Sequence, residues 1–310
     1  MKIKHSILVI VLLFQFGHGN SQPTRNRVEF NGLILYADSL KAKEDISSLI
    51  RILKREVNLE NHDEKILSFY YYNLAICYSA RDLIDSSCFF LSMALDHSSD
   101  YNNLIYTDSD FENFHDVPCW GRIIQKIDSA FISKNQEIRN KQLAIELYHI
   151  YLMDQHVRGL GLKKISKRLN SIDSTNLVRV EEIIKVYGWP TFSLVGETAS
   201  LGAFLVIQHG NIHVQQQYLK SIFDAAMINE ASKEWVALLM DRISVVKKGV
   251  QIFGTQVYKI RDPINMQKVT YDYFPIRDET QVDSLRKAFD MIPLKEYYAR
   301  YGIDYKPAEE

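Results

Sequence analysis

The amino-acid sequence predicts a mostly α-helical protein with two helical parts, the second of which carries a short antiparallel β-hairpin. Two observations predict this fold class. Apolar residues recur at three- and four-residue steps through most of the chain, which is the spacing of helices with one buried face. After Gly249 the period changes, and the segments from Val250 to Ile276 have the composition of extended strands. A chain of 310 residues with 46% hydrophobic residues can bury a sizeable core, and two domains are expected.

Residues 1–21 have the pattern of a secretory signal peptide. Lys2 and Lys4 precede a short apolar run from Ile7 to Phe16, and small residues follow it. This run is too short for a comfortable transmembrane helix, and no later stretch of about 20 apolar residues follows. We therefore expect an exported soluble protein, periplasmic or secreted, with no membrane contact after signal cleavage. The formal net charge of -1 gives no reason to expect a nucleic-acid partner.

Residues 22–135 are expected to form the first domain. The apolar spacing from Arg27 to Val57 predicts an antiparallel pair of amphipathic helices. The following segment combines small residues, which let two helices approach, with larger residues that fill the groove between them. These residues are Tyr72, Asn73, Leu74, Ala75, Tyr78, Ser87, Leu91, Ala94 and Leu95. Over about 34 residues the pattern resembles one tetratricopeptide repeat.

The sequence departs from that repeat at three places. Ala75 stands where glycine is usual, Ser87 where alanine is usual and Ser99 where proline is usual. None of these residues breaks a helix pair sterically. A single repeat needs neighbours to bury its faces, and the preceding helix pair is the expected neighbour. The resemblance implies a tetratricopeptide-like domain that holds a peptide or protein partner.

The segment from Tyr101 to Ile124 is rich in aromatic and acidic residues and is expected to form a short helical cap on this domain. A calcium loop is an alternative for its acidic side chains. Such a loop needs a glycine at its sixth position and a glutamate at its twelfth, and both are missing here. A solvated acidic turn is therefore the preferred interpretation.

The three cysteines, Cys77, Cys88 and Cys119, allow at most one disulfide within the chain. Cys77 and Cys88 lie on two adjacent predicted helices and could meet. We favour three buried free thiols, because free cysteine is among the most buried residue types. No C-x-x-C spacing occurs, so the cysteines do not suggest a metal site.

A polar stretch from Lys126 to Glu137 marks the expected domain boundary, so the second domain covers residues 136–310. Its first helices carry apolar faces and lead to a break at Tyr187-Gly188-Trp189-Pro190. Glycine suits the end of a helix, and proline disfavours a helical conformation for the residue before it. A new helix is expected after this break.

Three helices are expected between the break and Gly249, which is a natural helix stop. The first is apolar almost all round, as a helix buried on several sides would be, and it ends at His209. The second starts after Asn211, whose side chain can cap it. Their expected bounds are about Ala199 to His209, His213 to Ile228 and Ser232 to Lys247. A last helix, from Leu285 to Tyr301, is expected to pack back over the domain.

Polar residues interrupt these core-like helices and the extended segment after them, and they define the candidate site. His209 is the candidate general acid or base, and Asp241 is the carboxylate that would orient it. An arginine, Arg158 or Arg242, would hold an anionic group. The candidate ligand-binding residues are Asp154, Gln155, Arg158, Trp189, Gln208, Arg242, Gln251 and Gln256.

Two alternatives compete with this site. One is a structural network, in which Arg158 pairs with Asp241 while glutamine side chains bond the backbone and lock the hairpin onto the helices. The other is a metal site, because His209 and His213 have the spacing of two zinc ligands on one helix. Gly210 interrupts that helix and no glutamate lies between the histidines, so we expect no metal and no other cofactor.

A set of short motifs runs through the second domain from Asp154-Gln155 to Gly254-Thr255-Gln256. The set also contains Arg158, Tyr187-Gly188-Trp189-Pro190, Gly196, Gln208-His209, Asp241-Arg242 and Gly249. Together these motifs resemble an uncharacterised bacterial domain family of unknown function, over roughly Gln142 to Tyr301. In that family a small residue and an aspartate often follow Gln-His, whereas Gly210 and Asn211 follow here. The resemblance implies a boundary and a residue list but no activity.

Two functions follow from these observations. One is an exported binding or interaction protein with a polar pocket around His209 for an unknown small ligand. The other is a hydrolase-like enzyme that uses His209 with Asp241 and with Arg158 or Arg242. Catalysis needs His209 within hydrogen-bond reach of a carboxylate beside an open cleft. A structural network would instead leave both ring nitrogens buried and bonded.

Overall fold

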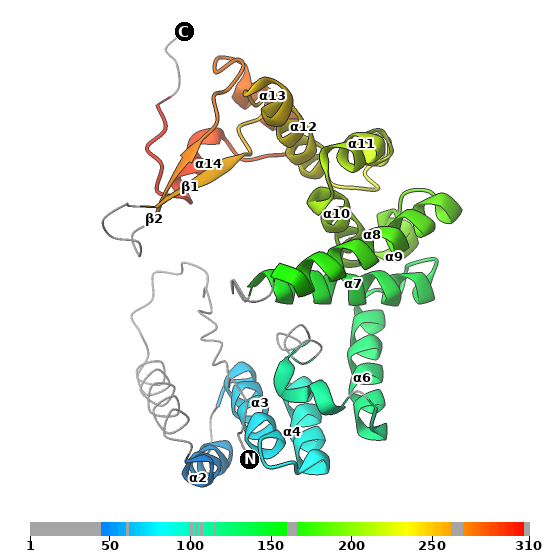
Figure 1. The fold of residues 1–310 in the computed structure, drawn as a ribbon, viewed down its shortest axis with the longest axis vertical. Coiled ribbons are helices and arrows are strands. Elements are labelled where there is room, and N and C mark those ends of the chain that lie inside the picture. Colours follow the sequence, from blue (N-terminus) through cyan, green and yellow to red (C-terminus); the bar gives the residue numbers. More distant parts are fainter. Residues whose placement is uncertain are drawn as a thin grey trace. The chain divides into compact units, whose positions relative to one another are not determined.

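The computed structural model describes residues 45–59, 62–98, 102, 105, 108–114, 116–159, 166–261 and 269–306 (Figure 1). The expected signal peptide and the chain up to residue 44, where the first predicted helix lies, fall outside these residues. Within them the fold is mostly helical with one two-stranded antiparallel sheet, which confirms the predicted fold class. None of the described helices is both long and apolar enough to cross a membrane.

The chain separates into two compact units. The N-terminal unit comprises Met1–Lys134 together with Gln155–Leu162, and the C-terminal unit comprises Asn135–Asp154 together with Lys163–Glu310. Each unit has its own cluster of buried apolar side chains.

The described residues of the N-terminal unit are mostly helical. Asp45 caps its first described helix, because the carboxylate accepts the backbone N–H of Ser48 at 3.1 Å. Asp63 caps the next one in the same way, at 2.6 Å from the N–H of Lys65. The elements are α2 (Ile46–Val57), α3 (Glu64–Ser79), α4 (Ile84–His97), the 3-10 helix η2 (Ser109–Phe114) and α6 (Pro118–Lys134).

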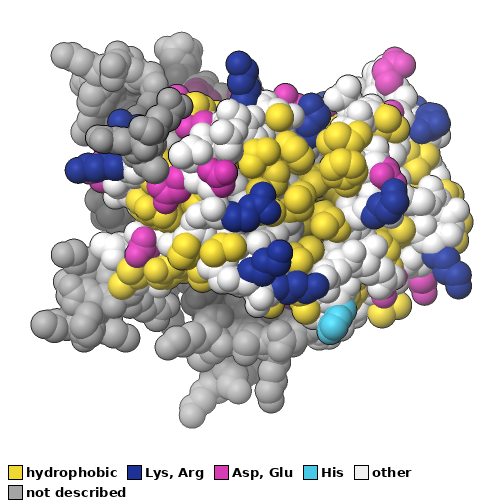
Figure 2. All heavy atoms as spheres, turned by 90° about the horizontal axis from the view of Figure 1, so that it is seen from above, with side chains coloured by type: hydrophobic (Ala, Val, Ile, Leu, Met, Phe, Trp, Pro, Cys, Tyr) yellow, Lys and Arg dark blue, Asp and Glu magenta, His cyan; other side chains and the backbone are white. Residues whose placement is uncertain are grey.

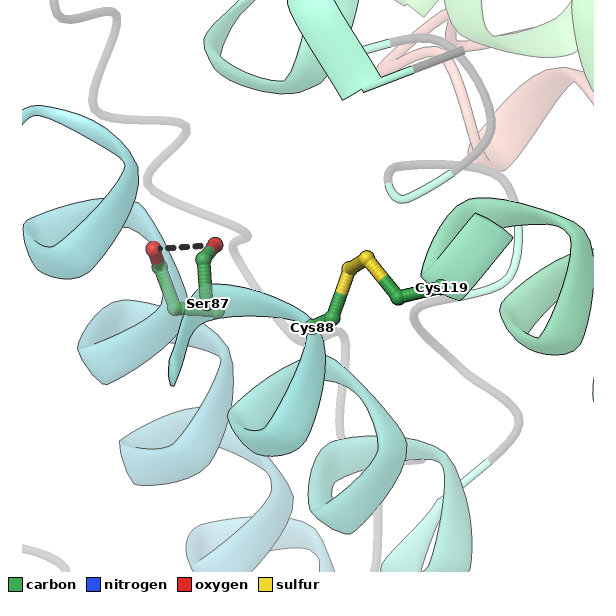
Figure 3. The surroundings of a disulfide bond; sticks show 4 residues. Ser87, Cys88 and Cys119 are labelled. Carbon is green, nitrogen blue, oxygen red and sulfur yellow. Dashed lines mark hydrogen bonds between the residues drawn. A yellow bond between two sulfur atoms is a disulfide. The ribbon is translucent and has the colours of Figure 1, made fainter. Parts of the chain in front are cut away.

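Two buried serines join α3 to α4. The Ser68 hydroxyl of α3 donates to the backbone carbonyl of Ala94 at 2.7 Å. The Ser87 hydroxyl of α4 donates in the opposite sense, to the carbonyl of Ala75 at 2.8 Å (Figure 3). Ser87 stands where the repeat usually has alanine, and its hydroxyl is accommodated because a carbonyl of the facing helix accepts its proton.

A disulfide joins Cys88 of α4 to Cys119 of α6, with the Cα atoms 6.1 Å apart (Figure 3). The expectation of three free thiols is therefore wrong, and so is the pairing of Cys77 with Cys88. Neighbouring residues on a helix point about 100° apart, so Ser87 faces α3 while Cys88 faces α6. Cys77 takes no part in this disulfide and is buried in the apolar cluster with Leu53.

The C-terminal unit contains the remaining helices, and local signals set several of their ends. The Asn211 side chain accepts the backbone N–H of His213 at 2.9 Å, which confirms it as an N-cap. Gly249 ends another helix with a positive φ of 71°, as predicted for a glycine stop. The helices are α7 (Lys141–Gly159), α8 (Ser166–Tyr187), α9 (Phe192–Val195), α10 (Glu197–His209), α11 (Ile212–Met227), α12 (Lys233–Lys248), α13 (Val282–Ala288) and α14 (Leu294–Ala299).

The sheet consists of β1 (Val257–Arg261) and β2 (Val269–Tyr273), which pair antiparallel with Val257 opposite Tyr273. An isolated parallel bridge between Gln251 and Ile276 extends the pairing toward α12. Tyr273 stacks on Tyr298 of α14 with ring centroids 4.6 Å apart, so the sheet packs against the last helix. This matches the predicted hairpin near residues 250–276.

The surface carries both signs of charge. Figure 2 shows one face of the molecule, on which hydrophobic side chains gather and Lys and Arg side chains are scattered among them, with acidic side chains around. In the C-terminal unit, large apolar side chains such as Val186 and Ile228 are well exposed. This mixture agrees with the formal net charge of -1.

Candidate functional site

Helices α7 and α10 approach each other closely at Gly202. α10 carries the candidate base His209, and α7 carries Asp154. A Cβ built on Gly202 of α10 would stand 2.6 Å from the backbone carbonyl oxygen of Leu147 and 3.0 Å from the Cβ of Tyr151, both on α7. Any side chain would push the two helices apart, so Gly202 sets their closest approach. Seven residues, about two turns, lead from Gly202 to His209 and from Leu147 to Asp154. The close approach therefore brings His209 and Asp154 together.

His209 and Asp154 form a hydrogen-bonded pair. Nδ1 of His209 lies 2.9 Å from Oδ1 of Asp154. The Asp154 side chain is 1% exposed and the His209 side chain is 19% exposed. An ionised carboxylate can only accept hydrogen bonds, so in the neutral ring Nδ1 carries the proton and Nε2 keeps the lone pair. The pair therefore presents Nε2 as the nitrogen that can take up a proton.

Tyr151 lies three residues before Asp154 on the same face of α7. Burial raises the pKa of the Tyr151 phenol, and the negative charge of Asp154 raises that pKa further. Asp154 and the Tyr151 phenol are therefore both poorly solvated. Under such conditions a hydrogen bond to the carboxylate is stronger than it would be in water.

The backbone beside His209 is held by the next helix. α10 ends at His209, since Gly210 has an extended backbone with φ -62° and ψ 168°. Gln215 of α11 donates from Nε2 to the backbone carbonyls of Gln208 and Gly210, at 2.9 Å each. These two bonds fix the direction in which the chain leaves α10, and with it the position of the imidazole.

His213 lies on α11 and is exposed, so it does not share a helix with His209. The arrangement considered for zinc needs both imidazoles on one helical face, and that helix is interrupted at Gly210. Within the part of the chain that the structure describes, no group of three or more His, Cys, Asp or Glu side chains is placed to hold a metal ion.

Asp241 has a structural role that differs from the expected orienting one. It is fully buried in α12. Its Oδ1 accepts the backbone N–H of Ile252 at 2.5 Å and of Phe253 at 2.9 Å. Its Oδ2 accepts the N–H and the hydroxyl of Thr255, at 2.8 and 2.9 Å. Asp241 therefore anchors the loop after α12, and the carboxylate that contacts the candidate base is the one on α7.

Gln251 and Gln256 belong to the same anchored loop. Nε2 of Gln251 donates to the carbonyl of Phe274 at 2.6 Å, and its Oε1 accepts the N–H of Gln256 at 2.7 Å. Nε2 of Gln256 donates to the Thr255 hydroxyl at 2.9 Å. These bonds lock the hairpin in the manner of the structural network considered as an alternative.

The other candidate residues are spread over three helices and the break before α9. Trp189 is buried, and among the described residues its Nε1 has no hydrogen-bond partner. Gln208 is buried next to the candidate base, whereas Gln155 and Arg242 are half-buried in α7 and α12. Arg158 is in α7, and its side chain lies outside the described part of the structure, as does any contact between it and Asp241.

A cavity of about 470 Å³ opens at the other end of α10. Its walls include Phe192, Trp235 and Phe289, with residues from the first turn of α10 such as Glu197. None of the predicted site residues lines it. His209 is twelve residues further along α10, which at about 1.5 Å per residue is about 18 Å.

Two features of this unit are not evident in the sequence. Asp154 and His209 are brought together only by the close approach at Gly202. The rings of the aromatic cavity individually look like core residues. An available signal was the glycine in an otherwise apolar helix, which often marks a close helix contact.

The fold and these contacts define a mostly helical protein whose C-terminal unit holds a histidine–aspartate pair. Residues 162–306 match the model of a family described as a family of unknown function (DUF6624). The matched residues include His209 and Asp241 but begin after Asp154. They agree with the uncharacterised domain predicted in the C-terminal half. No curated protein and no solved structure matches the chain.

Proposed function

We propose that this is an exported protein whose C-terminal unit is a hydrolase-like enzyme, with His209 as the general acid and base on a small polar ligand. The observation that carries the proposal is the hydrogen bond between His209 Nδ1 and Asp154 Oδ1, 2.9 Å long. It satisfies one of the two requirements stated for catalysis, a carboxylate within hydrogen-bond reach of the candidate base; the other requirement is an open cleft beside His209. It also favours catalysis over a binding protein that has no acid–base chemistry.

The pair supports proton transfer in two ways. Asp154 holds the neutral imidazole with its proton on Nδ1, so Nε2 can accept a proton from water or from a ligand hydroxyl as that oxygen attacks. The carboxylate then stabilises the imidazolium that forms, and Nε2 returns the same proton to the leaving group. The half-buried ring keeps part of its surface accessible to a ligand.

The N-terminal unit supports the rest of the proposal. The Cys88–Cys119 disulfide suits an oxidising compartment and thus an exported, periplasmic or secreted protein. The antiparallel α3 and α4 helices, which resemble one repeat of a peptide-holding scaffold, would bind a peptide or protein partner.

The test combines spectroscopy with kinetics on the full chain. The 15N signals of the imidazoles report which ring nitrogen carries the proton. Hydrolysis is measured on 4-nitrophenyl acetate, 4-nitrophenyl phosphate and a 4-nitrophenyl glucoside. His209→Gln and Asp154→Asn remove the two halves of the pair, and His213→Gln is the matched control, because His213 is an exposed histidine four residues away.

We expect the Nδ1–H form of His209 in the wild type and the loss of that preference in Asp154→Asn. We expect turnover of one substrate class, reduced about 100-fold or more in His209→Gln, which is the usual contribution of a general acid or base. His213→Gln should retain wild-type turnover. No turnover of any class, or equal turnover in wild type and His209→Gln, contradicts the proposal.

A further inference from the structure

The cavity at the N-terminal end of α10 is separate from the histidine–aspartate pair. Three helices contribute to it: α9 through Phe192, α10 through Glu197 and α12 through Trp235. Its volume of about 470 Å³ falls in the range of small-molecule sites.

Two aromatic walls of the cavity are held by other rings. Phe192 and Trp235 meet nearly at right angles, with centroids 5.6 Å apart and planes at 85°, so they form adjacent walls of a corner. Trp235 also stacks on Phe204 of α10, at 4.8 Å and 11°. Phe289 also lines the cavity, and its ring contacts that of Phe253 with centroids 4.7 Å apart. The walls are therefore in place before a ligand arrives.

The main chain also fixes the Phe192 wall. The N–H of Phe192 donates to the carbonyl of Glu230 at 3.0 Å, and the N–H of Ser193 donates to the Glu230 carboxylate at 2.8 Å. The Ser193 amide is the main reason that the pKa of Glu230 lies below its usual value. Such preorganisation reduces the entropy that ligand binding would otherwise lose.

The charge of the lining is negative. It contains the carboxylates of Glu197, Glu234 and Asp290 against the single ammonium of Lys233, which leaves a net charge of three minus one, or two negative charges. Lys233 is already paired with Asp290 at 2.8 Å. Neither Glu197 nor Glu234 forms a salt bridge within the described ranges. The charge of Glu234 also acts on the buried guanidinium of Arg286, where it opposes the lowering of the pKa that burial causes.

An anion is not the ligand that this lining favours. The N-termini of α10 and α12 each contribute about half a positive charge. Glu197 and Glu234 sit in those first turns and each bring a full negative charge. The sum of these charges, from the two helix ends and the two carboxylates, is therefore negative.

We infer that this cavity binds a small organic cation with an ammonium group, held in the corner that the Phe192 and Trp235 rings form and neutralised by Glu197 and Glu234. Aromatic faces attract a cation through their quadrupole, and the two carboxylates add charge attraction. A neutral molecule of the same shape would gain only the apolar contact.

The test is calorimetric titration of the full chain with choline and with 3,3-dimethylbutan-1-ol, which replaces the quaternary nitrogen by carbon. We expect choline to bind with a dissociation constant of about 1 mM or tighter and the alcohol to bind at least about tenfold more weakly. Glu197→Gln and Glu234→Gln should each weaken choline binding about three- to tenfold.

Glu296→Gln is the matched control, because Glu296 is an exposed acid in the first turn of α14 outside the cavity. It should bind choline as the wild type does. His209→Gln should also bind choline normally, which separates this inference from the proposed acid–base site. Equal binding of choline and the alcohol, no saturable choline binding in the millimolar range, or an equal loss in Glu296→Gln overturns the inference.

Discussion

Asp241 shows how backbone and hydroxyl donors can hold a carboxylate that is fully buried in a helix. Its two oxygens accept three backbone N–H groups and one hydroxyl from the loop between α12 and β1. Buried charge is costly unless hydrogen bonds replace the lost water, and here four donors do so. The residue therefore fixes the path of the chain from helix to sheet.

At the residue scale we predict that Asp241→Asn destabilises the C-terminal unit by about 3 kcal/mol. Asparagine presents one oxygen and an amino group, so the donors that now meet the second oxygen would face another donor. The measurement is the free energy of unfolding from urea titration. Wild type and variant are compared with the same m-value, the slope of that free energy against urea concentration.

Asp224→Asn is the control for this variant, because Asp224 forms an exposed pair with Lys220. Such pairs contribute about 1 kcal/mol or less. An Asp241→Asn protein as stable as the control would show that the loop is held by other contacts.

At the element scale, the contact between α7 and α10 depends on the absence of a side chain at one position. The Cβ of an alanine at Gly202 would lie 2.6 Å from a backbone oxygen, which cannot rotate away as a side chain could. The helices can accommodate it only by separating. His209 and Asp154 lie on these same two helices, so their distance would change with the separation.

We predict that Gly202→Ala destabilises the C-terminal unit by about 2 kcal/mol, through overpacking that exceeds the gain in helix propensity. It should also weaken the Nδ1–H signal of His209 in the imidazole 15N spectrum. Gly121→Ala in α6 is the matched control, because a Cβ there meets nothing within 4 Å. That variant should be stabilised by about 0.5 to 1 kcal/mol. An unchanged His209 signal in Gly202→Ala would argue against this account of the site.

At the scale of the whole molecule, the disulfide should stabilise one unit and leave the other unaffected. Cys88 and Cys119, 31 residues apart, both belong to the N-terminal unit. Closing a loop of that length stabilises a fold by about 4 kcal/mol in the chain-entropy model. Reduction should therefore lower the unfolding transition of this unit only.

The measurement is a thiol titration in denaturant with unfolding curves in parallel. One thiol per chain should react without reductant, and three should react after reduction. A Cys88→Ala/Cys119→Ala double variant should unfold like the reduced protein and respond no further to reductant. Three reactive thiols before reduction would refute the disulfide.

Local signals predicted much of the fold. Asn211 and Gly249 set helix ends through their own side chain and backbone conformation, so the sequence alone was sufficient there. The change of period after Gly249 located the hairpin. The signal peptide, the exported location and the tetratricopeptide resemblance stay predictions.

The candidate site was harder to predict, because its partners are far apart in sequence. Asp154 and His209 are 55 residues apart and meet only through the helix contact at Gly202. The buried position of Asp241 did indicate that it needed partners, but the partners are backbone amides of a loop, which leave no pattern in side-chain types. Proximity of this kind depends on tertiary packing.

The two buried serines between α3 and α4 also determine the alignment of that helix pair. One hydroxyl donates from α3 to α4 and the other from α4 to α3, so each helix supplies one donor and one acceptor to the contact. If one helix slid along the other by a residue, both hydroxyls would lose their acceptors at once, at about 1 to 3 kcal/mol each. An interface made only of alanine and leucine would tolerate such a slip more easily. The α3–α4 pair therefore has a single preferred alignment, set by two hydroxyl groups inside an apolar contact.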